Sequence, residues 1–536
     1  MSTIPRWTPP QGTTKQEERL LARLGRVRKL LGFLRRHRHE LVDDAFQSQL
    51  EAMYRKSGAG REAVAPGLMA MAMLVQGYLG ASDAELVELT VVDLRVQMVL
   101  GCLGAAEPPF AQGTFQGFRE RMLAHDMDRR LLERTVELAR STKEFDPKKL
   151  PRTLRVGIDS CPLEGAGRVE DTFNLLGHAA RRVAECAAEL LKWPMDRVCR
   201  EAGCPLLLAS SLKAGLDIDW NDTAEKAEAI KTVTGQLDAL RAFLQQRLPE
   251  ELAKPPLEEH VRTLEQIRGQ DLEPDPGGGG GERIRDGVAR DRRVSIEDPD
   301  MRHGRKTKTK SFNGYKRHLA ADLDTDLVLA AVVTPANRPE EEAAPSLKAD
   351  IERQKLSIGG LFIDRGYVNS VIVDEVLANR GEVVCKAWNS RNGTLFPKSA
   401  FAVNIRDRTV TCPAGQSQAF ELGSTVEFDA DLCASCSLRA KCTSAEMGHG
   451  RTISIAENEQ LQQRFRKLQQ SPAGRRKLRE RTGIEHRLAH LSQRQGRRAR
   501  YRGTRKNTFD VRRASAIQNL ETTHRWEREA EMRRAA

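Results

Sequence analysis

Two short apolar runs, each stopped by an acidic residue, organise the hydrophobic pattern of this chain. Residues 361–363 (Leu-Phe-Ile) lead directly into Asp364, and residues 154–158 lead in the same way into Asp159. A short apolar run bounded by a charge predicts a buried strand with the acid at its end. Ligands of open α/β sheets bind at such ends, so two acids placed alike favour chemistry over mere capping of the next helices.

Further strands are expected at residues 314–322, 326–333 and 382–385. Helices are expected from 339 to about 354 and from about 368 to 379, between these strands. Strands that alternate with helices predict a mixed α/β sheet. Gly366, just after the second acid, is expected to permit the tight turn into the next helix.

Residues 1–145 have a helical pattern. Ser82 and Glu85 form the Ser-x-x-Glu pattern of a helix start. The last helix carries Arg119 and Arg121, and short helices joined by tight turns are typical of a helix-turn-helix-like DNA-binding domain. A plain helical scaffold fits the same pattern.

Two insertions interrupt the expected sheet. Residues 166–299 read as a helical insertion that contains a run of five glycines, typical of a flexible linker. Dimerisation, DNA clamping and a removable spacer all remain open for it. Residues 405–450 contain the second insertion. Its cysteines, in the spacing C-x20-C-x2-C-x5-C, suit either a structural tetrahedral zinc or free, redox-active thiols; they are Cys412, Cys433, Cys436 and Cys442.

Residues 455–520 are expected to return the chain to the core with a helix and a basic segment. Arg481 and Glu485 are four residues apart and so share one helical face. Taken alone, such a pair would be a surface ion pair. Residues 502–506 look like a phosphate-tracking loop, and residues 521–536 are expected to form a loose polar tail.

The charge of the chain is strongly basic, with a formal net charge of +13 over 536 residues. The lysines and arginines cluster in the half that carries Asp364, which favours nucleic acid as the partner. No apolar stretch is long enough for a membrane span, and the absence of a signal-peptide pattern places the expected protein in a reducing cytoplasm. The candidate DNA contacts are Arg119, Arg121, Lys306, Lys308, Lys310, Lys316, Arg365, Arg494, Arg502, Arg505 and Lys506.

Asp159, Asp364 and Glu485 together suggest a divalent-metal site. Three gathered carboxylates repel one another unless cations neutralise them, and magnesium (or manganese) takes carboxylate oxygens while leaving positions for water and phosphate. Two such ions about 4 Å apart suit phosphodiester chemistry. Walker A, G-x-S-x-G and H-E-x-x-H motifs, which would indicate other chemistry, do not occur in the sequence.

These residues resemble the bacterial insertion-sequence transposases that have a DDE catalytic core. Asp159 matches the first acid of that family, residues 364–367 match its D-R-G-Y motif, and Arg481 and Glu485 match its Y-x2-R-x3-E signature, in which Leu478 here replaces the tyrosine. The resemblance implies a ribonuclease-H-like α/β core with a helical N-terminal domain, in a subgroup with a four-cysteine insertion. It also implies that Arg481 orients Glu485 or a phosphate.

The function implied by the resemblance is DNA transposition. Such a protein would bind the terminal inverted repeats of its element, cleave the DNA ends and join the 3′-hydroxyls to target DNA. It would act as a homodimer in a synaptic complex and work on the nucleoid. Two alternatives remain open: an inactive relic that only binds DNA, and a metal-dependent nuclease of the same fold.

Overall fold

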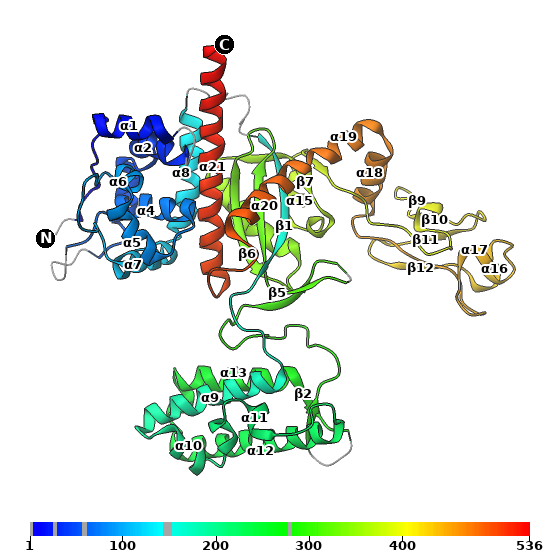
Figure 1. Ribbon diagram of the computed structural model, residues 1–536. Helices are drawn as coiled ribbons and strands as arrows, with labels where there is room; N and C mark the ends of the chain where they lie inside the picture. Colours follow the sequence, from blue (N-terminus) through cyan, green and yellow to red (C-terminus); the bar gives the residue numbers. More distant parts are fainter. Residues whose placement is uncertain (1–3, 25–28, 56–61, 143–152, 277–280, 308) are drawn as a thin grey trace.

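The computed structural model describes residues 4–24, 29–55, 62–142, 153–276, 281–307 and 309–536 (Figure 1). The N-terminal part is a helical bundle with its own apolar core, around helix α4, which is buried along most of its length. Ser82 caps α5 in the expected reciprocal arrangement with Glu85. The helices are α1 (Lys15–Leu24), α2 (Lys29–Leu41), α3 (Asp44–Glu51), α4 (Pro66–Leu79), α5 (Asp83–Val92), α6 (Leu94–Leu100), α7 (Gln112–Ala124) and α8 (Met127–Ser141).

The central element is a mixed sheet in the order β4-β5-β1-β7-β8, with β6 also paired to β5. Strand β1 runs antiparallel to β5 and parallel to β7, and β7 runs parallel to β8. This is the expected ribonuclease-H-like α/β arrangement. The strands are β1 (Thr153–Glu164), β4 (Arg302–Arg305), β5 (Ser311–Asp322), β6 (Val328–Pro335), β7 (Ser357–Ile363) and β8 (Glu382–Val384).

Helices cover both faces of the sheet. One face packs against the 3-10 helices η3 (Glu340–Ala343) and η4 (Arg365–Tyr367), with α14 (Ala344–Arg353) and α15 (Val371–Ala378). The other face packs against α20 (Thr482–Gln495), through Ile484, Leu488 and Leu491, and against α21 (Thr504–Ala535).

Helix α21 is shared between the sheet and the N-terminal bundle, between which it stands in Figure 1. Its Val511 and Ala514 join the core on the sheet, while Phe509, Ile517 and Leu520 join the core of the bundle. The expectation of a loose tail at residues 521–536 is therefore wrong, because α21 continues to Ala535 and buries Thr522 and Thr523. The expected loop at 502–506 is also corrected, since residue 504 already begins this helix.

The insertion between β1 and β4 folds as a separate helical layer below the sheet in Figure 1, with its own apolar core. Of its run of five consecutive glycines (277–281), the first four lie outside the described residues. Its elements are α9 (Thr172–Leu191), α10 (Met195–Glu201), η1 (Pro205–Leu208), α11 (Leu212–Leu216), α12 (Thr223–Arg247), η2 (Glu251–Ala253), α13 (Leu257–Asp271), β2 (Leu272–Pro274) and β3 (Glu282–Ile284).

The cysteine-bearing insertion consists of two small sheets and short helices, beside the central sheet in Figure 1. The chain then returns through α18 (Glu459–Gln470) and α19 (Pro472–Glu480). The elements of the insertion are η5 (Lys398–Ala400), β9 (Ala402–Asn404), β10 (Thr409–Thr411), β11 (Ser417–Ala419), β12 (Thr425–Glu427), α16 (Ala430–Ala434), α17 (Arg439–Cys442) and β13 (Thr452–Ser454).

Candidate active site

The two strand-end acids lie side by side at one edge of the sheet. Ile158 of β1 pairs with Ile363 of β7 in parallel register, so the next residues, Asp159 and Asp364, stand at neighbouring strand ends. Asp159 is half-buried, whereas Asp364 is exposed. The two predicted strands therefore do bring their acids together.

Helix α20 brings Glu485 to the same place. Gly157, two residues before Asp159, lets the helix approach, because a Cβ atom on residue 157 would lie 2.9 Å from Cβ of Ile484. A close approach of backbone to a packed side chain is a common reason for glycine within a strand. Glu485 follows Ile484 in the first turn of α20, with its carboxylate exposed to the cavity.

Arg481 connects the first and third acids. It stands at the junction of α19 and α20, where its Nη1 donates to Oδ2 of Asp159 at 3.0 Å and its Nη2 donates to Oε1 of Glu485. The guanidinium thus places one positive charge between two of the three carboxylates. The expected pairing of Arg481 with Glu485 across four residues is present, and its link to Asp159 is additional.

The environment of Asp159 favours its protonated form. Burial raises the pKa of its carboxyl to about 6, and the nearby charges of Asp364 and Glu340 act in the same direction. Arg481 and the backbone N–H of Ser160 oppose this rise in pKa by stabilising the charged carboxylate. A carboxyl whose pKa is raised by burial and by neighbouring carboxylates, inside a cavity, is typical of a functional site.

A cavity of about 340 Å³ contains all these groups. Its walls carry the predicted acids together with Glu340 and a set of basic side chains. The basic members at its rim are Arg305, Lys306 and Lys316, in addition to Arg481. Positive side chains at the rim would attract a polyanion. Cations bound by the acids at the centre would then face its reacting group.

The candidate metal ligands of the cavity are carboxylate oxygens, which hard divalent cations prefer. Among the described residues, no three His, Cys, Asp or Glu side chains are placed close enough together to ligate one ion. At this site, Arg481 supplies the positive charge between Asp159 and Glu485. A bound metal cation would take over this neutralising role.

The predicted DNA contacts separate into two groups. Lys306 and Lys316 line the cavity, and Lys310 is exposed nearby, whereas Lys308 lies outside the described residues. Arg365 is half-buried next to Asp364. Lys506 is exposed near the start of α21.

The remaining basic candidates are engaged in contacts within the protein. Arg119 is buried and forms an ion pair with Asp83, so the expectation that it contacts DNA is not supported by its position. Arg121 is exposed and its guanidinium carbon lies 4.6 Å from the ring centre of Tyr54. Three others form ion pairs: Arg494 with Glu521, Arg502 with Glu297, and Arg505 with Asp128.

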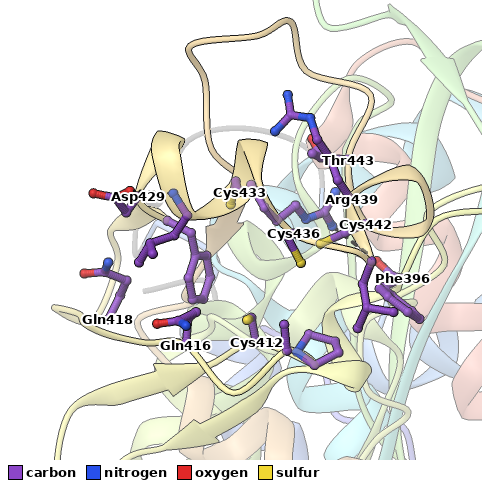
Figure 2. Close-up of a pocket in the computed structure, with 16 residues that line it drawn as sticks. Phe396, Cys412, Gln416, Gln418, Asp429, Cys433, Cys436, Arg439, Cys442 and Thr443 are labelled. Atoms are coloured by element: carbon purple, nitrogen blue, oxygen red, sulfur yellow. Dashed lines mark hydrogen bonds between the residues drawn. The ribbon is translucent and has the colours of Figure 1, made fainter.

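The four cysteines of the second insertion gather around one small cavity of about 30 Å³, as Figure 2 shows. Cys412 follows β10, Cys433 and Cys436 lie on and after α16, and Cys442 ends α17. All four are free thiols. Burial raises the pKa of the Cys442 thiol; Arg451 lowers it, and the other three cysteines act in the same direction as burial.

Two features of the site were not assigned from the sequence. Glu340 enters the cavity from η3; its signal in the sequence was its place shortly after Ala336 and Asn337, near where the resembled family often has an acid. The Tyr367 hydroxyl lies 2.6 Å from Nδ1 of His318, which fixes the D-R-G-Y segment to β5. A signal for the second contact existed in the sequence, since an alternating strand that carries a histidine among apolar residues suggests a buried partner.

The fold and the site together place this protein among the ribonuclease-H-like α/β proteins that gather acids at the ends of parallel strands. Two family models match the chain, one described as a transposase DDE domain over residues 411–524 and one as a transposase domain (DUF772) over residues 26–121. The two matches indicate that this chain is a DDE transposase of an insertion sequence. The first match includes the four cysteines, Arg481 and Glu485, and neither match includes Asp159 or Asp364.

No significant match was found among curated proteins or among solved structures. Within the described part of the chain, no helix combines the length and the apolar character that crossing a bilayer requires.

Proposed function

We propose that this transposase binds the terminal inverted repeats of its element, cleaves double-stranded DNA at their ends and joins the freed 3′-hydroxyls to target DNA. The observation that carries the proposal is the single cavity in which Asp159, Asp364 and Glu485 meet under a basic rim. Acids at the centre suit cations, and lysines at the rim suit the phosphates on either side of a scissile bond.

Asp159, Asp364 and Glu485 would hold two magnesium or manganese ions. When bound, such ions activate a water or 3′-hydroxyl and stabilise the leaving oxygen. Asp159 and Asp364 are fixed by neighbouring strands, and Glu485 is fixed by the helix that packs on Gly157, so the chain itself supplies the positioning.

The basic side chains have separate proposed tasks. The positive charge of Arg481 reduces the repulsion between Asp159 and Glu485. Once cations bind, Arg481 is free to orient Glu485 or a DNA phosphate. Lys306 and Lys316 at the rim, with exposed Lys310, hold the DNA backbone. Arg365 and Lys506 extend this surface.

A structural zinc ion is proposed for Cys412, Cys433, Cys436 and Cys442. All four thiols line one small cavity and supply the ligand set of a tetrahedral zinc, although no three of the described cysteines stand close enough together to ligate one ion; a bound zinc would lower the thiol pKa values and tie β10, α16 and α17 together. The apolar cluster of this insertion is small, with seven buried residues, so a metal would add to its stability.

Transposition requires two DNA ends in one complex, so a homodimer acting on the nucleoid in the cytoplasm is part of the proposal. The test is a joining assay with purified protein, labelled repeat-end DNA, magnesium and a supercoiled target plasmid. Labelled product covalently joined to the plasmid supports a transposase. Cleavage without joining would indicate a nuclease of the same fold, and binding without cleavage would indicate a DNA-binding relic.

A further inference from the structure

The cavity that contains the three acids receives a fourth carboxylate, Glu340, from the start of η3. Its Oε1 accepts a hydrogen bond of 2.5 Å from the hydroxyl of Ser160. Ser160 directly follows Asp159, and its backbone N–H donates to Oδ1 of Asp159 at 2.8 Å. One residue therefore connects Glu340 to the first acid.

Glu340 also packs against the turn that carries Asp364. A Cβ atom on residue 366 would collide with Oε2 of Glu340 and would lie 2.9 Å from its Cδ. The tight turn expected at Gly366 is present as η4, but Gly366 has no positive φ there; its missing side chain also makes room for the Glu340 carboxylate. Oε1 of Glu340 thus binds the residue after Asp159, and Oε2 lies against the turn after Asp364.

We propose that Glu340 is a positioning residue that fixes the distance between Asp159 and Asp364 through Ser160 and Gly366. A fourth anion next to three others costs free energy unless it gains contacts and cations share the site. Its contacts with Ser160 and with the Gly366 turn are those gains. This inference rests on the proposed metal-dependent function.

The test measures Mn²⁺ binding to the full-length protein by electron paramagnetic resonance, which needs no turnover. The variants are Glu340→Ala, Ser160→Ala, their double mutant and Glu340→Gln, with Asp159→Asn as the control that removes a proposed ligand. We expect each alanine variant to weaken Mn²⁺ binding about tenfold, the size of one lost hydrogen bond. The double variant should be no weaker than either single one, because both remove the same contact.

The conservative variant separates positioning from direct ligation. Glu340→Gln keeps an acceptor for Ser160 and should bind Mn²⁺ within about twofold to threefold of the wild type. If it is as weak as Glu340→Ala, the negative charge itself matters and the positioning role is refuted. The role is equally refuted if Glu340→Ala binds Mn²⁺ as the wild type does.

A second-site test uses the contact at Gly366. Gly366→Ala should weaken Mn²⁺ binding and lower the unfolding temperature, and adding Glu340→Ala should recover the unfolding temperature because the colliding carboxylate is gone. No recovery would refute the contact. A wild type that binds Mn²⁺ no more tightly than Asp159→Asn would refute the metal site of the proposed function itself, and the positioning role with it.

Discussion

A buried charge cluster around Arg512 joins the N-terminal helices to the catalytic sheet. Arg512 of α21 reaches Asp126 at 2.6 Å and Asp128 at 3.1 Å near the start of α8, and Asp350 of α14 at 2.9 Å. The side chains of Arg512, Asp128 and Asp350 are 8%, 1% and 5% exposed. One guanidinium thus contacts acids from two other elements, α8 and α14, that are distant along the chain.

Arg512→Met should therefore be strongly destabilising. It keeps an unbranched side chain but leaves Asp128 and Asp350 buried with fewer compensating charges, at a cost of about 3–5 kcal/mol. Arg525→Met on the same helix is the matched control. Its partner is Asp326, and with side chains 46% and 36% exposed the loss should be about 0–1 kcal/mol.

The assay is urea unfolding followed by circular dichroism at neutral pH. Asp350→Asn in the Arg512→Met background should recover part of the loss, because it removes a buried carboxylate whose remaining ion pair is with half-exposed Arg353. Equal losses for Arg512→Met and Arg525→Met would refute the view that the buried cluster, rather than any ion pair, joins these elements.

Three further predictions concern the site, the cysteines and the buried histidine. Lys316→Ala should weaken binding to all DNA sequences and reduce the slope of log K against log salt by about 0.9, whereas Arg119→Ala should lower stability and leave that slope unchanged. Purified protein should contain about one zinc per chain, and Cys436→Ala should lose it, as metal analysis would show; equal zinc in both would contradict the site. Burial lowers the pKa of His318 to about 3. Below pH ~6.5, the histidine of the unfolded chain takes up a proton that the folded protein does not, so the free energy of unfolding decreases as the pH falls. Between pH 7 and 5 the wild type should lose up to ~2 kcal/mol relative to His318→Gln in urea unfolding, and identical pH profiles would contradict this.

The sheet could be predicted because its signals are local. Short apolar runs that end in Asp159 and Asp364 identify strands and their ends, and parallel pairing then makes the acids neighbours. The link between Arg481 and Glu485 follows from helical spacing alone. The additional bond from Arg481 to Asp159 depends on how α20 crosses β1, which no local pattern contains.

The failures share one physical cause: local sequence does not show which polar groups become buried. Arg119 looked like a DNA contact because its helix is basic, yet it faces Asp83 inside the bundle. The polar segment after residue 520 lacks an apolar stripe, but it extends a helix already held between two domains. Glu340 stands in a run of three glutamates, and the local sequence does not show that the space left by Gly366 gives it a place in the cavity.

The central claim, that the strand-end acids carry phosphodiester chemistry, is tested most directly by cleavage of labelled DNA that carries the repeat ends, with magnesium and with EDTA. Asp364→Asn is compared with Asp374→Asn, which changes an exposed acid on α15 outside the cavity. We expect magnesium-dependent nicking at the repeat ends by the wild type and Asp374→Asn, and loss of nicking with retained DNA binding in Asp364→Asn. Undiminished nicking by Asp364→Asn would contradict the account.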